Sequence, residues 1–230
     1  MKLYETKKLH YGKYFYKLAI VNCCASYFRT EFQRDGSLKY ARRRLDNVNK
    51  HYMPNDYDWK VEIPVTPTYN DVIPVEHFWD AIDIYRHLLK HTDYKIRCES
   101  QHLLIYSNNR KMLVDLGNKL RQKYIEFWEP NPETIQALSS EKNVIIVSKP
   151  PQYEYKVTLG NKKGVAALAR WIEHNPKLAS MGTRARESCK NEDYVYGYYF
   201  YVRDIKTLLI IQMMAGDNIL RTDKFVYIKQ

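Results

Sequence analysis

The sequence is poor in cysteine. Its four cysteines are Cys23, Cys24, Cys98 and Cys189. No two of them have the C-x-x-C spacing of a zinc site or a redox motif, and adjacent cysteines rarely bridge each other. The pattern predicts thiols in a reducing, cytoplasmic compartment, and it argues against a structural zinc ion or a disulfide framework.

Long apolar runs are also missing. The longest, residues 18–21 and 208–214, are far shorter than the roughly 18–20 residues that cross a bilayer. The first residues carry charge but neither the apolar core nor the small-residue cleavage site of a signal peptide. We therefore expect a soluble intracellular protein with no membrane partner.

Recognised catalytic motifs are absent as well. The chain has no G-x-S-x-G, no H-x-H, no dinucleotide fingerprint and no P-loop. Glu154 and Lys156 match the E-x-K element of metal-dependent nucleases, which needs a further carboxylate such as Glu62 or Asp71. The two histidines at helical spacing, His87 and His91, have no third ligand nearby and are expected at the surface. We expect no cofactor and no metal, and the sequence leans away from an enzyme.

Positive charge is what the sequence does have, with a formal net charge of +11. The excess is +7 over residues 1–57 and +5 over residues 151–230, while residues 58–150 sum to −1. A basic chain attracts polyanions. The distribution predicts RNA or single-stranded DNA as the partner, bound by basic residues in the two end regions of the sequence.

A strand–helix–strand pattern occurs twice, at residues 102–128 and 194–228. In both places an aromatic-rich strand, a polar turn, a helix and a second aromatic strand follow one another. Each half of the chain can be written β-α-β-β-α-β, the ferredoxin-like order. The sequence predicts an α+β protein with two ferredoxin-like (βαββαβ) lobes in tandem and a basic N-terminal extension. The expected parts are an extension with a strand and an amphipathic helix at 1–57, a first lobe at 58–130, a connector at 131–142 and a second lobe at 143–230.

Several element predictions can be checked directly. Residues 59–65 alternate as a strand does, whereas the two prolines at 67–74 predict an irregular segment. Residues 194–202 read as one long strand. Residues 205–215 are apolar almost all round, which predicts a fully buried helix capped by Asp204.

The strand at 194–202 is the most aromatic part of a chain that holds 21 tyrosines. It shares Gly197, Tyr198 and Phe200 with the third-strand pattern of the RNA-recognition module and departs from it elsewhere, so the sequence does not place the chain in that family. Alternation puts one set of its side chains on a core-facing side and the other set outward. If the set that contains Phe200 faces the core, the base-stacking platform is Tyr199, Tyr201 and Arg203. The alternative is that the tyrosines pack between the lobes, and the sequence does not settle which face is exposed.

Three basic segments are candidates for phosphate contacts. They are the helix of residues 38–50, the loop of residues 160–164 between a strand and a helix, and the irregular or partly helical segment of residues 176–191. The predicted phosphate-binding residues are Arg42, Arg43, Arg44, Lys162, Lys163, Arg184 and Arg186.

At the level of architecture alone, tandem ferredoxin-like lobes with a basic face resemble CRISPR repeat-processing endonucleases, but the glycine-rich loop that those enzymes carry near the C-terminus is missing here. The preferred hypothesis is non-catalytic binding of single-stranded or structured nucleic acid. One alternative is a viral (phage) assembly or accessory protein with a protein partner or a homo-oligomer, and the other is a metal-dependent nuclease.

Overall fold

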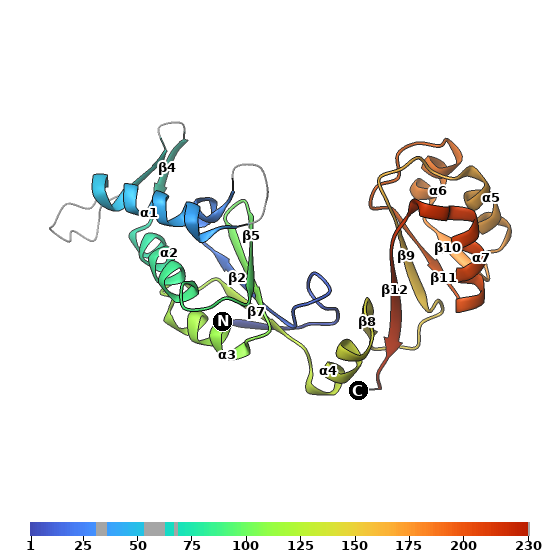
Figure 1. The fold of residues 1–230 in the computed structure, drawn as a ribbon, viewed down its shortest axis with the longest axis horizontal. Helices are drawn as coiled ribbons and strands as arrows, with labels where there is room; N and C mark the ends of the chain where they lie inside the picture. Colours follow the sequence, from blue (N-terminus) through green and yellow to red (C-terminus); the bar gives the residue numbers. More distant parts are fainter. Residues whose placement is uncertain (31–35, 53–62, 67–68, 230) are drawn as a thin grey trace. The chain divides into compact units, whose positions relative to one another are not determined.

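The structure is a computed structural model, which describes residues 1–30, 36–52, 63–66 and 69–229. For those of these residues that lie between 48 and 73, it describes the backbone and not the side chains. The chain forms a mixed α+β fold with two compact units (Figure 1). The first unit combines Met1–Thr6 with Lys13–Asn131, and the second combines Lys7–Gly12 with Pro132–Gln230. The short segment Lys7–Gly12 therefore leaves the first unit, contributes to the second, and returns.

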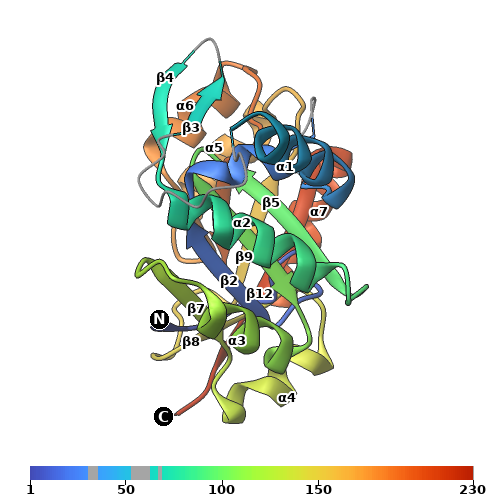
Figure 2. The same ribbon diagram turned by 90° about the vertical axis from the view of Figure 1, so that its left-hand side faces the viewer.

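The first unit is built on a five-stranded sheet whose helices cover one face (Figure 2). Leu18, Phe127 and Ile105 point to that face and are fully buried. Two of its five strands, β1 and β2, come from the region predicted to be an N-terminal extension. Its elements are β1 (Lys2–Glu5), β2 (Tyr16–Val21), η1 (Cys23–Phe28), α1 (Leu38–Tyr52), β3 (Ile63–Thr66), β4 (Tyr69–Ile73), α2 (Val75–Leu88), β5 (Tyr94–Glu99), β6 (His102–Ser107), α3 (Arg110–Lys119) and β7 (Ile125–Glu129).

The second unit is built in the same way. Figure 1 shows α5 and α7 on one side of its sheet, where Phe200, Val202 and Leu159 form the core with no exposed surface. Its elements are α4 (Pro132–Ser140), β8 (Val144–Val147), β9 (Tyr155–Leu159), α5 (Ala166–His174), β10 (Ala179–Met181), α6 (Thr183–Lys190), β11 (Tyr199–Val202), α7 (Ile205–Ala215), η2 (Gly216–Asn218) and β12 (Ile219–Tyr227).

The two sheets have one topology. Their strand orders are β1-β7-β2-β6-β5 and β8-β12-β9-β11-β10, the second written in the direction that matches the first. In each sheet the edge strand (β1 or β8) runs parallel to its neighbour, and all other pairs are antiparallel. The registers correspond too, since Lys17 lies opposite Tyr106 in the first unit and Lys156 lies opposite Tyr201 in the second.

Two element predictions need correction. Residues 194–202 are not one strand, because β11 begins only at Tyr199 and Gly197 turns the chain with a φ of +79°. The proline-flanked segment is not irregular, since β4 forms there and pairs with β3. The strand expected at 59–65 lies largely outside the described residues. Residues 176–191 are partly helical as expected, in α6, and also form the short strand β10.

Helix α7 is correctly placed but is not fully buried. Leu208 and Ile211 belong to the core, whereas Leu209 is 55% and Met213 88% exposed. The predicted cap is confirmed, because the Asp204 carboxylate accepts a hydrogen bond from the Thr207 amide at 2.8 Å. That bond, with Arg203 beside it, lowers the pKa of Asp204 to about 2. A sequence that is apolar all round therefore has one face on the core and one face on solvent.

His87 lies in the interior of the first unit rather than at the surface. Only 9% of it is exposed, and its Nε2 lies 3.0 Å from the Met112 carbonyl oxygen, to which it donates. Burial lowers the pKa of His87 from its usual 6.5. The histidine therefore ties α2 to α3 in its neutral form.

This burial makes the stability of the first unit depend on pH. As the pH falls below about 6.5, the unfolded chain takes up a proton at His87 before the folded chain does, so the free energy of unfolding decreases toward the folded-state pKa. We expect urea unfolding between pH 7 and pH 5 to show this loss, and a shallower pH dependence in His87→Gln. The matched variant His102→Gln, at an exposed histidine, should show the same pH dependence as wild type. If His87→Gln also gave the wild-type curve, the account would be contradicted.

Candidate functional site

The helix-free face of the second sheet collects aromatic side chains. Because Phe200 and Val202 point into the core, Tyr199 and Tyr201 point to the other face. The rings of Tyr199 and Tyr201 meet edge to face with centroids 5.6 Å apart. The sequence put both tyrosines on one side of the strand, and the structure shows that the other side faces the core.

A groove lies at one end of this face, and we call it the aromatic groove. Its aromatic walls are Tyr153, Tyr201 and Phe225, which come from three separate segments of the chain. The Tyr153 and Tyr201 rings are nearly parallel, at 21° and 6.3 Å, and Tyr201 lies 6.0 Å from Phe225. Pro151 and Ile146 add apolar surface, while Lys7 and Lys149 supply positive charge. Burial raises the pKa of the Tyr201 phenol, and the neighbouring Tyr199 adds to this, so the ring stays neutral.

Cations continue from the groove along the same face. Lys156 Nζ lies 3.9 Å from the centroid of the Tyr199 ring, a cation–π contact. Asp223, in the next strand, is fully buried and is balanced by two partners: Lys8 at 2.6 Å and Arg221 at 3.1 Å. Burial lowers the pKa of Lys8, against the opposing effect of Asp223. One buried carboxylate against two cations leaves this part of the face positive.

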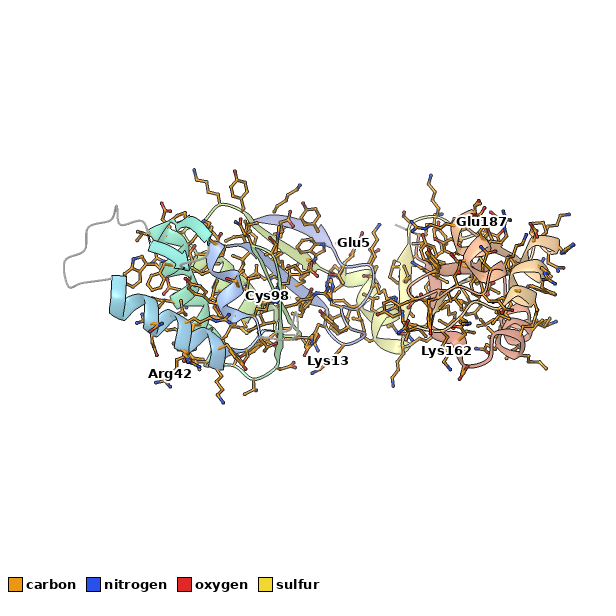
Figure 3. All side chains as sticks on the ribbon, turned by 90° about the horizontal axis from the view of Figure 1, so that it is seen from above. Glu5, Lys13, Arg42, Cys98, Lys162 and Glu187 are labelled. Atoms are coloured by element: carbon orange, nitrogen blue, oxygen red, sulfur yellow. The ribbon has the colours of Figure 1, made fainter. Side chains whose placement is uncertain are left out.

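The predicted phosphate residues of the second unit do not all lie on this face. Lys162, labelled in Figure 3, is in the loop after β9 and forms an ion pair with Asp217. In the same loop the Lys163 carbonyl accepts a hydrogen bond from the Asn218 side chain at 2.8 Å, and the side chain of Lys163 is exposed.

Arg184 and Arg186 lie on α6, whose buried residues join the core on the helix-covered side of the sheet. Arg184 is exposed, whereas Arg186 lies 4.0 Å from Glu173. The same Glu173 pairs with Lys190 at 2.7 Å, which lowers the pKa of the carboxyl. The structure therefore separates these arginines from the aromatic groove.

The arginine run of α1 divides in two. Arg42, labelled in Figure 3, and Arg43 are exposed. With Lys39 they line a shallow depression. Arg42 also lies 3.6 Å from Asp46. Arg44 instead donates hydrogen bonds to the backbone carbonyls of Ser26 and Arg29, where η1 ends. Arg44 thus has a structural contact, while Arg42 and Arg43 keep surface for a ligand.

Arg203 completes the predicted platform only in part. It follows β11 directly, but its guanidinium pairs with the Asp204 carboxylate at 2.8 Å. About half of the side chain remains exposed. Its role in stacking stays a prediction.

Sequence reasoning did not assign five residues to this site, namely Lys7, Lys149, Tyr153, Lys156 and Phe225, and it named Lys156 for the nuclease alternative alone. One signal could have found two of them. Residues 14–20 read YFYKLAI and residues 153–159 read YEYKVTL, and the structure places both segments at the same position in their sheets. The duplication therefore includes the first long strand of each unit as well as the later strand–helix–strand pattern.

The matching face of the first unit is already filled by contacts of its own. Lys17, the counterpart of Lys156, lies 3.2 Å from the centroid of the Trp128 ring. Trp128 is stacked on Tyr4 with centroids 4.7 Å apart. Tyr14 and Tyr106, the counterparts of Tyr153 and Tyr201, are both more than 90% buried. Of these two equivalent sheet surfaces, the one in the second unit is accessible to a ligand.

Comparison with known proteins adds no family. No family model, no curated protein and no solved structure matches this chain. Among the helices that the structure describes, none has the length and apolar character needed to cross a bilayer. The functional argument therefore depends on the geometry of this chain.

Proposed function

We propose that this protein binds single-stranded or structured nucleic acid, without catalysis, through the helix-free face of the second sheet. The observation that carries the proposal is the aromatic groove, in which Tyr153, Tyr201 and Phe225 lie together with Lys7 and Lys149 beside them. Aromatic rings next to mobile cations suit a ligand that alternates flat bases with phosphates.

The geometry favours single strands over regular duplexes. A base stacks on an aromatic ring only if its face is free, and base pairing with stacking hides that face in a duplex. Stacking on one ring contributes roughly 1–3 kcal/mol and is tolerant of sequence. We therefore expect weak sequence preference, and RNA and single-stranded DNA both remain candidate partners.

Phosphate contacts supply the remaining affinity in this proposal. Lys149 and Lys156 lie on the same sheet face as the groove, and Lys163 is exposed in the loop beyond it. Arg42, Arg43 and Arg184 are also exposed and stay proposed contacts for a longer strand. The excess of positive charge would speed the encounter with a polyanion.

We also propose that both units belong to the ferredoxin-like class. The support is the strand order: without the edge strands β1 and β8, each sheet is antiparallel with its last strand beside its first and its third beside its second. Helices on one face leave the other face available for a ligand, as in the RNA-recognition module. A cytoplasmic location is proposed on the buried, unbridged thiols of Cys24 and Cys189.

The salt dependence of binding should identify the phosphate contacts. Each phosphate neutralised on a single strand contributes about −0.7 to the slope of log affinity against log salt concentration. Replacing Lys149 with glutamine should make that slope shallower by roughly this amount. Lys142→Gln, an exposed change elsewhere in the same unit, is the control; equal slopes for both variants would remove Lys149 from the site.

Fluorescence anisotropy with labelled single-stranded RNA, single-stranded DNA and duplex DNA tests the proposal. We expect salt-sensitive binding of a single-stranded probe and weaker binding of the duplex. Flat titrations for all three probes at low salt would overturn it.

The alternatives receive unequal support. For the nuclease, Glu154 and Lys156 are present, but within the described residues no three His, Cys, Asp or Glu side chains come together as a metal site. The side chains of Glu62 and Asp71 lie outside the described part. The assembly or accessory role has a specific observation in its favour, the exposed apolar face of α7.

A further inference from the structure

One face of α7 is exposed and apolar. Ile205 is 50%, Leu209 55% and Met213 88% exposed, and Ile210 beside them is 46% exposed. The first three residues are four positions apart, so they follow one line along the helix. Together these four side chains, which we call the α7 stripe, expose several hundred Å² of apolar surface. That is comparable with the roughly 300–600 Å² of the largest patch on a typical monomer, which is often a functional surface.

The first unit offers a comparison for this surface, because the two units share one topology. Helix α3 occupies the same place in the first unit, between the third and last strands of the common topology. Both helices begin after a capping residue, Asn109 or Asp204, which accepts a hydrogen bond from the amide three residues later. The two helices can therefore be compared position by position from their caps.

The buried faces agree and the exposed faces do not. Leu113 and Leu116 in α3 match Leu208 and Ile211 in α7, and all four are buried. On the outer side, Ile205, Ile210 and Met213 replace residues that are polar in α3. Their counterparts there are Arg110, Asp115 and Asn118. In α3 this side carries ion pairs, Arg110 with Glu129 and Lys111 with Asp115, both at 2.6 Å.

The fold therefore does not require an apolar outer face on this helix. A charged helix face is well solvated, whereas an exposed apolar helix face favours association with another surface. The α7 stripe lies on the helix-covered side of the sheet, opposite the aromatic groove. Its occupant can be bound at the same time as nucleic acid.

We propose that the α7 stripe pairs with the same stripe of a second copy of this chain, with the two α7 helices antiparallel about a two-fold axis. A self-complementary patch closes into a dimer and leaves no further surface for growth. The stripe supplies most of the roughly 800 Å² that each partner gives to an interface of standard size.

The helix dipoles fit the antiparallel arrangement, because antiparallel pairing sets the two dipoles in opposite directions. Lys206 lies in the first turn. The exposed Asp217 follows the last turn, where its charge is balanced by an ion pair with Lys162 of its own chain. Lys206 is also the sole charged residue within α7, so the net charge of the chain acts weakly at this contact.

Sedimentation of the full chain over a wide concentration range tests the dimer. We expect twice the chain mass of 27.6 kDa. Met213→Glu should raise the dimer dissociation constant about thirty-fold or more, as loss of a hot-spot contact of about 2 kcal/mol does. The matched control is Asn118→Glu at the equivalent position of α3, which should sediment as wild type does. A wild-type monomer at every concentration, or a Met213→Glu variant that dimerises normally, would overturn the proposal.

Disulfide trapping tests the geometry separately. Leu209 is at the centre of the stripe and lies near its own copy across the axis, so Leu209→Cys should form a covalent dimer under mild oxidation. Ile205→Cys should not, because antiparallel helices place its two copies about 12 Å apart along the axis. The reverse pattern would contradict the antiparallel arrangement. If the wild-type chain is a monomer that co-floats with anionic phospholipid vesicles, the stripe binds a membrane and the dimer proposal is wrong. Nucleic-acid binding could persist in either case.

Discussion

Replacing Tyr153 and Tyr201 together with alanine should lower the affinity for single-stranded nucleic acid by about 100-fold. Each ring is expected to stack on a base, and each stack contributes roughly 1–3 kcal/mol. The two rings contact each other, so their effects should not be strictly additive. Anisotropy titrations of the double variant and both single variants, at one salt concentration, measure the loss.

Two controls separate stacking from a general loss of structure. Tyr201→Phe keeps the ring and should bind within about three-fold of wild type, since stacking does not need the hydroxyl. Tyr124→Ala removes a tyrosine that is 77% exposed in the first unit and should leave affinity unchanged. Equal affinity for wild type and the double alanine variant would exclude the aromatic groove as the binding surface.

The largest expected effect on stability comes from Asp80 in α2. Asp80 is fully buried, and its carboxylate accepts hydrogen bonds from the backbone amides of Arg121 and Gln122 at 3.0 and 3.1 Å. The guanidinium of Arg121 adds a contact at 3.1 Å. Asp80→Ala leaves these donors without an acceptor and should cost about 3 kcal/mol in the free energy of unfolding. Urea unfolding of the first unit measures this.

The neighbouring Asp83 provides a matched comparison on the same helix. It contacts the same Arg121 guanidinium at 2.8 Å, but it is partly solvated and holds no backbone amide. Asp83→Ala should cost less than about 1 kcal/mol, as solvated ion pairs do. Similar losses for the two variants would show that the ion pair, and not the amide acceptance, stabilises the junction between α2 and the segment after α3.

The α+β class was predictable because it depends on local alternation, which also puts Tyr199 and Tyr201 on one side of their strand. Which side faces the core was not predictable, because it depends on where the helices pack. Along β11 every second side chain enters the core, and the sequence marks this with Phe200 and Val202. The start of that strand was not predictable from the run of tyrosines. Gly197 adopts a positive φ and turns the chain, so Tyr194 and Tyr196 end up exposed before the strand.

The aromatic groove could not be read from the sequence because it depends on pairing between distant segments. Tyr153 meets Tyr201 through the register of β9 with β11, and Phe225 joins them from β12. Single strands do not reveal their partners. The repeated segments at 14–20 and 153–159 carried part of that information, because they mark the same strand in both units.

Composition alone misjudged two further sites. Helix α7 is apolar almost all round, and the sequence could not show that tertiary packing covers one side only. The run of three arginines on α1 reads as one patch in the sequence, whereas Arg44 turns back to the carbonyls at the end of η1. In both cases, contacts with residues distant in the sequence decide which positions of the helix are buried or hydrogen-bonded.

Photo-crosslinking of the protein to a single-stranded oligonucleotide, followed by mapping of the modified peptides, tests the central claim most directly. The account predicts crosslinks at Tyr201 and at Tyr153 or Phe225, which are lost when excess unlabelled single strand is added. Crosslinks confined to Arg42 and Arg43 on α1, with none in the second unit, would contradict it.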